Sequence, residues 1–187
     1  MFGLFNTKKQ ISNQVAVAIS NTFRASLGSE FIDENGDLNV PDKFWSDEYI
    51  VGFISVLISL FLKYDFKGDS FSIEKKGEIG NLILMQVCKE SWMQVRDIFL
   101  KNTNTESDLF KKGGDESFMM YIAVMGKLKS DSNNTLIKQA KSLAETRREY
   151  YSQNAKILGK ENSDQSNISL AIMELTLLKH IKKNYKN

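Results

Sequence analysis

Apolar residues recur every three or four positions along most of the chain, and this spacing predicts helices. The first helical segment extends from about Lys8 to Leu27. Its apolar face consists of Ile11, Val15, Ile19 and Phe23. Thr7 and Gln10 have the spacing of a capping box at its start, and Gly28 is a natural stop for the helix.

The most apolar run in the chain extends from Tyr49 to Leu62. Ser46 can cap a helix here, with Asp47 and Glu48 in the first turn, where the helix dipole favours anions. The run is shorter than the roughly 20 residues that a membrane-spanning helix requires. Its small residues, which fall on one side of a helix, are Gly52, Ser55 and Ser59. We therefore predict a central buried helix whose small side lets another helix approach closely.

Four further helices complete the predicted set of about six. They run from about Glu78 to Leu100, from Asp115 to Lys129, from residue 134 to Leu158, and from Ser163 to Lys183. The polar stretches between them predict loops, with a minor hairpin or short strand near residues 65–77, where Phe71, Ser72 and Ile73 alternate. We expect an all-α fold, a single globular helical domain over residues 1–187. Residues 1–7 and 184–187 are candidates for flexible ends.

Composition supports a folded protein without a strong electrostatic preference. Among 187 residues, 42% are hydrophobic and 26% are charged, which are ordinary globular values. The net charge of +2 does not require nucleic acid or a membrane as partner. The chain has a single cysteine, Cys88, which favours a reducing compartment. In the short N-terminal apolar stretch the charges follow the apolar residues rather than precede them, so we predict no export signal. We expect a cytoplasmic protein.

The residues that usually carry out catalysis are scarce. The single histidine, His180, lies near the end of the last predicted helix, where the dipole favours a cation and a surface position is expected. Cys88 lies in the apolar arc of its helix, as a core residue would. Zinc-ligand spacing is absent. A calcium-loop register over residues 31–42 fails, because Phe31 falls where a carboxylate is needed and Asp42 falls where a glutamate usually binds. We therefore predict no catalytic residue, no metal and no cofactor, which favours a protein that is not an enzyme.

Polar residues interrupt the apolar stripe of the fifth predicted helix. Arg147 and Asn154 lie near the middle of this stripe, two turns apart, with Tyr150 beside them. A guanidinium that faces the core has to be paired or has to reach solvent. One interpretation is an internal ion pair that fixes helix packing. The other is a groove in which Arg147 receives an acidic group of a partner or ligand.

Acidic residues gather between Glu30 and Glu48, where Lys43 is the only base. Asp33, Glu34 and Asp37 belong to this stretch, and Phe44 and Trp45 lie beside it. A solvated loop explains the charge without a function. The functional interpretation is a recognition surface for a basic partner, since aromatic residues are common at interface hot spots. Basic residues near Arg147 and in the C-terminal tail suggest nucleic acid, but the near-neutral net charge and the scattered glutamates argue against a continuous basic stripe, so nucleic acid is not expected.

These features predict a non-enzymatic helical protein that acts by binding another protein, as a regulator, an adaptor or an immunity-type protein. One alternative is a peripheral membrane protein that inserts Phe2, Leu4 and Phe5 beside Lys8 and Lys9. Such a short anchor would bind a membrane surface weakly. The other alternative is a small-ligand-binding protein or a carboxylate-based enzyme whose site surrounds Arg147.

Overall fold

A computed structural model describes residues 7–27, 31–34, 38–105, 107–128, 134–155 and 163–185, and these residues are mostly helical. The helices are α1 (Lys8–Ser26), α2 (Glu48–Asp65), α3 (Ile73–Cys88), α4 (Trp92–Asn104), α5 (Asp108–Val124), α6 (Thr135–Thr146), α7 (Arg148–Ala155), α8 (Asp164–Met173) and α9 (Lys179–Tyr185). Within the described ranges, β pairing is limited to one isolated bridge between Ile32 and Leu38. The all-α prediction is confirmed.

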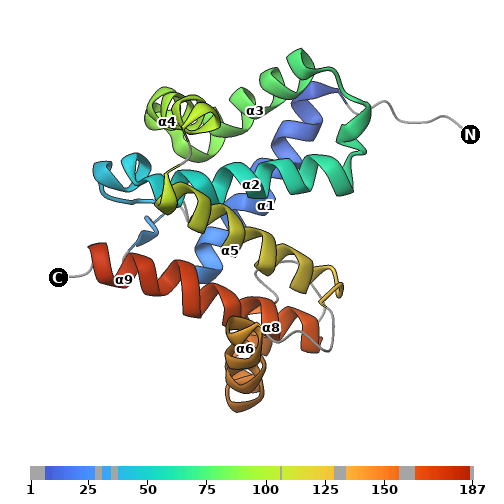
Figure 1. The fold of residues 1–187 in the computed structure, drawn as a ribbon, viewed down its shortest axis with the longest axis vertical. Coiled ribbons are helices and arrows are strands. Elements are labelled where there is room, and N and C mark those ends of the chain that lie inside the picture. The colour runs from blue at the N-terminus through green and yellow to red at the C-terminus, as the bar shows by residue number, and fades with distance from the viewer. Residues whose placement is uncertain are drawn as a thin grey trace, which may run out of the picture.

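Short irregular turns connect or interrupt several of these helices. They are the 3-10 turns η2 (Asp42–Ser46), η3 (Gly68–Ser70) and η4 (Lys89–Ser91) and the π turn η5 (Glu174–Leu178). The π turn joins α8 to α9, so these segments form one long element (Figure 1). Among the described helices, none is both long enough and apolar enough to cross a membrane.

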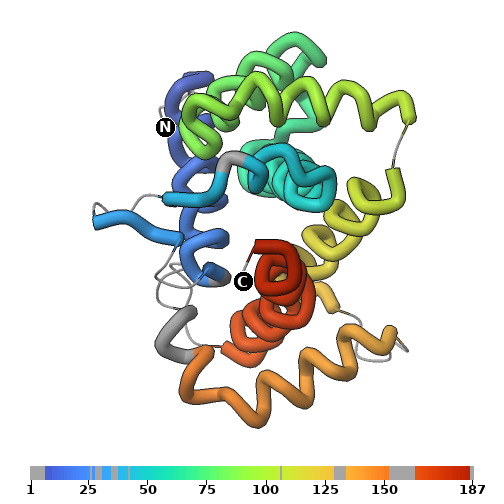
Figure 2. The backbone as a smooth tube through the Cα atoms, turned by 90° about the vertical axis from the view of Figure 1, so that its left-hand side faces the viewer, coloured from blue at the N-terminus to red at the C-terminus, as the bar shows by residue number. Residues whose placement is uncertain are grey.

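Helix α2 lies in the middle of the molecule (Figure 1). Helices α3 and α4 cover one side of it, and the long α8–α9 element lies on the other side of α2 and α5 (Figure 2). Five residues of α2 have no exposed surface at all: Ile50, Val51, Phe53, Ile54 and Leu57. One core cluster joins these residues to side chains from α1 through α9. The prediction of a central buried helix is confirmed.

Two glycines bring α2 and α5 unusually close together. A Cβ atom added to Gly52 would lie 2.0 Å from the carbonyl oxygen of Phe110, and one added to Gly113 would lie 2.0 Å from that of Tyr49. The predicted close approach at Gly52 is therefore confirmed. The prediction that Gly113 lies in a loop is wrong, because α5 begins at Asp108 and the glycine is buried at this helix crossing. A glycine lowers the stability of the helix itself, but here it allows close contact between α2 and α5, which any larger side chain would prevent.

Several predicted boundaries are also wrong. The strand near residues 65–77 does not form, because Ser72 caps α3 by accepting a hydrogen bond from the backbone amide of Lys75. The helix predicted from Glu78 to Leu100 is divided by η4, where Lys89 has a φ of 48°. Local patterning could not reveal this break, because apolar spacing continues on both sides of it.

Caps explain the remaining differences. The capping box of Thr7 and Gln10 at the start of α1 is confirmed. The N-cap of α2 is Asp47 and not Ser46, since Oδ1 of Asp47 accepts a hydrogen bond from the backbone amide of Tyr49. The predicted fifth helix is divided at Arg147, which is the C-cap of α6. The predicted stop at Gly28 and the predicted end at Leu158 lie outside the described residues.

Candidate functional site

The side chains of His180 and Asp47 meet where α9 crosses the start of α2. Nε2 of His180 lies 2.7 Å from Oδ2 of Asp47, and these side chains are only 15% and 14% exposed. The imidazole ring stacks on the ring of Tyr49, with centroids 4.0 Å apart. The prediction that His180 is a solvated surface residue is wrong, because α9 packs back onto the N-terminus of α2.

The carboxylate of Asp47 is the centre of a hydrogen-bond network. The hydroxyl of Tyr185 donates to Oδ2 at 2.7 Å, and the backbone amide of Tyr49 donates to Oδ1 at 2.9 Å. Burial disfavours the ionised carboxyl, but the hydrogen bonds from His180 and Tyr185 outweigh it and hold the pKa of Asp47 below its ordinary value. Burial and the hydrogen bond to Asp47 both raise the pKa of Tyr185. Asp47 is therefore a structural anion.

A cleft of about 690 Å³ opens beside this network. Its walls come from η2 and the start of α2, from α5, and from η5 and α9. Four lysines line it: Lys43, Lys112, Lys179 and Lys183. Glu116 also lines it, and its Oε2 accepts a hydrogen bond of 2.5 Å from the hydroxyl of Tyr49. We call this hollow the lysine cleft.

The Asp47–His180 pair orients an imidazole in the way that catalytic dyads do. The other ring nitrogen of His180, Nδ1, lies 3.3 Å from the side-chain amide nitrogen of Asn184. The same amide nitrogen lies 3.2 Å from Nε2 and donates to the backbone carbonyl of His180 at 2.9 Å. The contacts of His180 with Asp47 and Tyr49 hold α9 against the start of α2.

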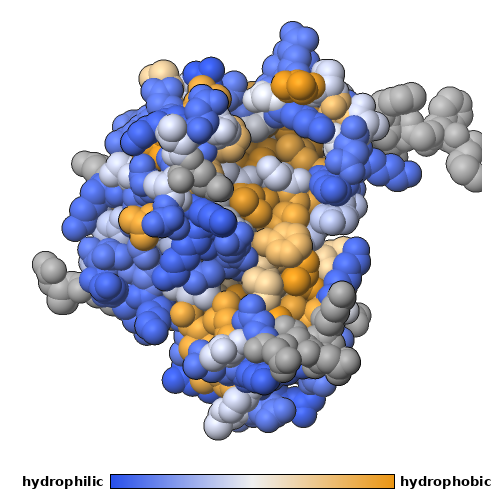
Figure 3. All heavy atoms as spheres, in the orientation of Figure 1, coloured by the Kyte–Doolittle hydropathy of each residue, from blue (hydrophilic) through white to orange (hydrophobic). Residues whose placement is uncertain are grey.

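A second hollow, of about 580 Å³, lies between α2, α3 and α4. Its lining is mainly apolar, and Figure 3 shows apolar surface gathered in the hollow between α2 and α3. The large apolar side chains of its walls are Ile58, Leu62, Ile73, Leu84, Phe99 and Leu100. Ile73 is 90% exposed, which is extreme for a residue of its kind. We call this hollow the apolar groove.

Small residues keep the apolar groove open. Ser55 and Ser59 line it from α2, and Gly77 and Gly80 line it from α3. A Cβ atom added to either glycine would meet nothing within 4 Å. A glycine inside a helix costs about 1 kcal/mol relative to alanine, and here no contact within the described part of the chain requires it. The predicted small side of α2 thus faces two different neighbours, with Gly52 against α5 and the serines in the groove.

The rim of the apolar groove is mainly basic. Lys63, Lys76 and Arg96 line it, and Asp69 is the acidic residue among its lining side chains. Nζ of Lys63 lies 3.8 Å from Oδ2 of Asp69. Lys76 and Arg96 form no ion pair with any residue of the described ranges, so their charge remains available at the rim.

The residues predicted around Arg147 lie at the far end of the molecule from the apolar groove. Arg147 is half-exposed rather than directed into the core, and its Nη1 pairs with Oε1 of Glu174 at 2.5 Å. Tyr151, which is buried, donates to the other oxygen of Glu174 at 2.6 Å. The prediction that Arg147 faces the core is wrong, because the helix ends at this residue and the apolar stripe of α6 does not continue into α7.

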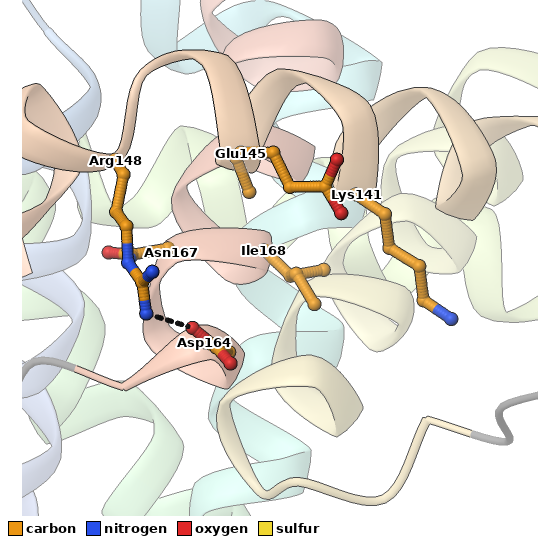
Figure 4. Close-up of a pocket in the computed structure, with 7 residues that line it drawn as sticks. Lys141, Glu145, Arg148, Asp164, Asn167 and Ile168 are labelled. Carbon is orange, nitrogen blue, oxygen red and sulfur yellow. Dashed lines mark hydrogen bonds and ion pairs between the residues drawn. The ribbon is translucent and has the colours of Figure 1, made fainter.

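Tyr150 is exposed, and the side chain of Asn154 lies outside the described residues. A wide, shallow hollow beside Arg147 is lined by Thr146, Arg147, Glu149 and Tyr150. A neighbouring hollow of about 360 Å³ lies between α6 and α8 (Figure 4), where Nη2 of Arg148 and Oδ1 of Asp164 are 3.0 Å apart. The ligand-binding role of Arg147 stays a prediction, and its guanidinium already has a carboxylate partner.

The aromatic pair of the acidic stretch is not at the surface. Phe44 has no exposed area and Trp45 is 5% exposed, and both rings pack edge-on against Phe23 of α1. The prediction that Phe44 and Trp45 present a recognition surface is therefore wrong. They resemble surface residues in sequence because they flank charges, but η2 turns them into the core. Asp33 is partly exposed and Glu34 is exposed, whereas Asp37 lies outside the described residues.

Cys88 is buried, as its place in the apolar arc predicted, and burial raises the pKa of its thiol. Among the described residues, no group of three or more acidic, histidine or cysteine side chains could hold a metal ion. The N-terminal apolar residues Phe2, Leu4 and Phe5 of the predicted membrane contact lie outside the described residues.

In comparisons with known proteins, no protein-family model, curated protein or solved structure matches the chain. The described residues form a helical bundle with an apolar groove between α2, α3 and α4 and a lysine cleft beside α9. Sequence reasoning missed the apolar groove and the lysine cleft. The available signal was the i, i+4 pairing of Lys179 with Lys183, and the pair of glycines, Gly77 and Gly80, within one apolar helix.

Proposed function

We propose that this chain binds another protein by accepting one of its amphipathic helices in the apolar groove between α2, α3 and α4. The observation that carries the proposal is the open space above Gly77 and Gly80, which the chain maintains at a cost in helix stability. A helix that lies in a groove needs this combination of small residues along its path and apolar side chains on either side.

The exposed apolar residues around the groove support the same function. Ile73 at one end and Leu100 on α4 both expose large parts of their side chains to water. A contiguous apolar hollow with a polar rim is typical of a protein interaction site, whereas scattered apolar residues are not. Burial of these side chains beneath a partner helix would provide the main driving force for binding.

The charge at the rim indicates the chemistry of the partner. Because Lys76 and Arg96 have no carboxylate partner among the described residues, an acidic helix would fit the groove better than a basic one. The acidic stretch from Glu30 to Glu48 predicted a basic partner instead. The surface predicted for that basic partner included Phe44 and Trp45, and both are buried.

A groove-filling variant tests the proposal. A Cβ atom added to Gly80 would meet nothing within 4 Å, so we expect Gly80→Leu to direct its side chain into the groove and to leave the fold intact. Gln94→Leu, on the exposed side of α4, is the matched control. Proteins captured from the native cell by the unaltered chain and by Gln94→Leu, but lost with Gly80→Leu, are the expected partners.

The second step uses a synthetic peptide that covers the helix of a captured partner. We expect Gly80→Leu to weaken its binding by about tenfold or more, measured by fluorescence anisotropy. Lys76→Glu should weaken it as well, whereas Lys111→Glu, on the exposed surface of α5, should not. Equal capture by Gly80→Leu and the unaltered chain would rule out the groove as the binding site.

A further inference from the structure

The lysine cleft carries more positive charge than its walls balance. Its four ammonium groups come from three separate elements: Lys43 from η2, Lys112 from α5, and Lys179 and Lys183 from α9. Since Lys179 and Lys183 are one helical turn apart, their side chains lie on the same face of α9. Segments that are far apart in the sequence thus bring cations to one place.

The carboxylates of the cleft are engaged elsewhere. Glu48 forms an ion pair with Lys101, which is not part of the lining, with 3.5 Å between Oε1 and Nζ. Asp47 accepts hydrogen bonds from His180 and Tyr185, and Glu116 accepts one from Tyr49.

Among the residues that the structure describes, none of the four lysines forms an ion pair. Lys43 contacts the ring of Tyr185, with its Nζ 5.3 Å from the ring centroid. Two carboxylates, Asp47 and Glu116, remain to balance four ammonium groups once Glu48 is assigned to Lys101. The cleft therefore has an excess of about two positive charges before any charge on His180 is counted.

The helix dipole favours Lys183, which lies in the last turn of α9, but it does not account for Lys43 and Lys112 from the other two elements. Like charges one turn apart on a helix, such as Lys179 and Lys183, also repel each other. The π turn Glu174–Leu178 directly precedes these lysines, and its Leu175 and Thr176 line the cleft. Such turns are rare, and they occur frequently at functional sites. The charge excess and the π turn are two independent observations that indicate a functional site at the cleft.

We propose that the lysine cleft binds a small-molecule phosphate monoester. Lys112, Lys179 and Lys183 would contact the phosphate oxygens as point charges, a role in which lysine is common. A phosphate monoester has a second ionisation near pH 6 and carries nearly two negative charges at pH 7, which matches the charge excess of the cleft. The volume of about 690 Å³ leaves room for the organic part, which would rest on Leu109 and Leu175.

Two aryl esters of matched shape test the proposal. Phenyl phosphate is doubly charged at about pH 7.5, whereas phenyl sulfate carries a single charge. We expect isothermal titration calorimetry to show phenyl phosphate binding at least about tenfold more tightly than phenyl sulfate. Equal affinities would overturn the proposal, because a cleft with an excess of two charges has to distinguish the two esters.

Substitutions then locate the site. Lys179→Met combined with Lys183→Met should weaken phenyl phosphate binding by about tenfold or more, and Lys112→Met alone should weaken it measurably. The matched control is Lys182→Met, which removes an exposed charge from the same helix outside the cleft. If Lys182→Met weakens binding as much as the pair does, the effect is general electrostatic attraction and the proposed site is wrong. Circular dichroism confirms that each variant retains its helices.

The same phosphate chemistry occurs in a lipid headgroup, so one arm of the experiment uses vesicles. Vesicles of phosphatidylcholine with phosphatidic acid are sedimented with the protein, and vesicles of phosphatidylcholine alone are the control. We expect no added sedimentation with phosphatidic acid. Retention on phosphatidic acid vesicles without binding of phenyl phosphate would overturn the small-molecule proposal in favour of a membrane lipid.

Discussion

Nε2 of His180 lies 2.7 Å from Oδ2 of Asp47, although 133 residues separate the two in the chain. Asp47 at the same time caps α2, because its Oδ1 accepts a hydrogen bond from the backbone amide of Tyr49. One carboxylate therefore fixes the start of the central helix and the position of α9. The lysine cleft owes its shape to this contact, since α9 supplies one of its walls.

Asp47→Ala should lower the free energy of unfolding by about 2–3 kcal/mol. The substitution removes a helix cap, which contributes about 1 kcal/mol, and it leaves the buried donors of His180 and Tyr185 without their acceptor. Chemical denaturation followed by circular dichroism measures the change. Asp97→Ala, on the exposed face of α4, is the control and should change stability by less than about 0.5 kcal/mol. Equal effects of the two substitutions would contradict the structural role of Asp47.

Stability at acid pH should depend on Asp47. Burial opposes its ionisation, but the hydrogen bonds from His180 and Tyr185 dominate and lower its pKa in the folded protein below the ordinary value of 3.8. A lowered pKa adds stability that is present above 3.8 and is lost as the pH falls through the pKa of the folded state. Between about pH 5 and pH 2, the unaltered protein should therefore lose more stability than Asp47→Asn, which keeps a capping oxygen. Parallel pH profiles of the two proteins would show that Asp47 is not the responsible group.

Gly113→Ala and Gly52→Ala should each destabilise the protein by about 3 kcal/mol or more. Each added Cβ would lie 2.0 Å from a carbonyl oxygen of the facing helix, so α2 and α5 would have to separate. Gly77→Ala is the matched control, because it fills open space, and it should raise stability by about 0.5–1 kcal/mol. Thermal and urea denaturation measure all three variants. A neutral Gly113→Ala would mean that the two helices are not in contact at this crossing.

Arg147 and Tyr151 share Glu174 as partner, but they should differ in their contribution to stability. Arg147 is half-exposed, so Arg147→Met should cost at most about 1 kcal/mol. Tyr151 is buried, and its hydroxyl donates to an ionised acceptor, so Tyr151→Phe should cost about 1–2 kcal/mol. Denaturation at low and at high salt separates the two, since salt should weaken only the contribution of Arg147. A salt-independent loss in Arg147→Met that exceeds that of Tyr151→Phe would contradict this assignment.

The thiol of Cys88 should be unreactive in the folded protein. Burial keeps it from solvent and raises its pKa, so little nucleophilic thiolate forms. We expect iodoacetamide to leave the native protein unmodified at about pH 8, under conditions in which the protein in guanidinium chloride takes up one carbamidomethyl group. Intact-mass spectrometry counts the groups. Rapid modification of the native protein would show that the helix carrying Cys88 opens readily.

The sequence alone determined the features that depend on neighbouring residues. The apolar face of α1 and its capping box at Thr7 follow from spacing, and α2 is the most apolar run in the chain. Because helix formation depends on contacts within one or two turns, these elements could be predicted before any tertiary structure was known. The burial of Cys88 could be predicted for the same reason.

Only the tertiary structure decided which residues meet across long distances. The sequence favours a surface position for His180, but α9 packs it against Asp47. The sequence likewise favours exposure of Phe44 and Trp45, but η2 directs both side chains into the core. The break at Arg147 likewise depends on how α6 and α7 pack on α8. Such contacts form because apolar faces bury one another in three dimensions, and the order of residues along the chain does not specify which faces those will be.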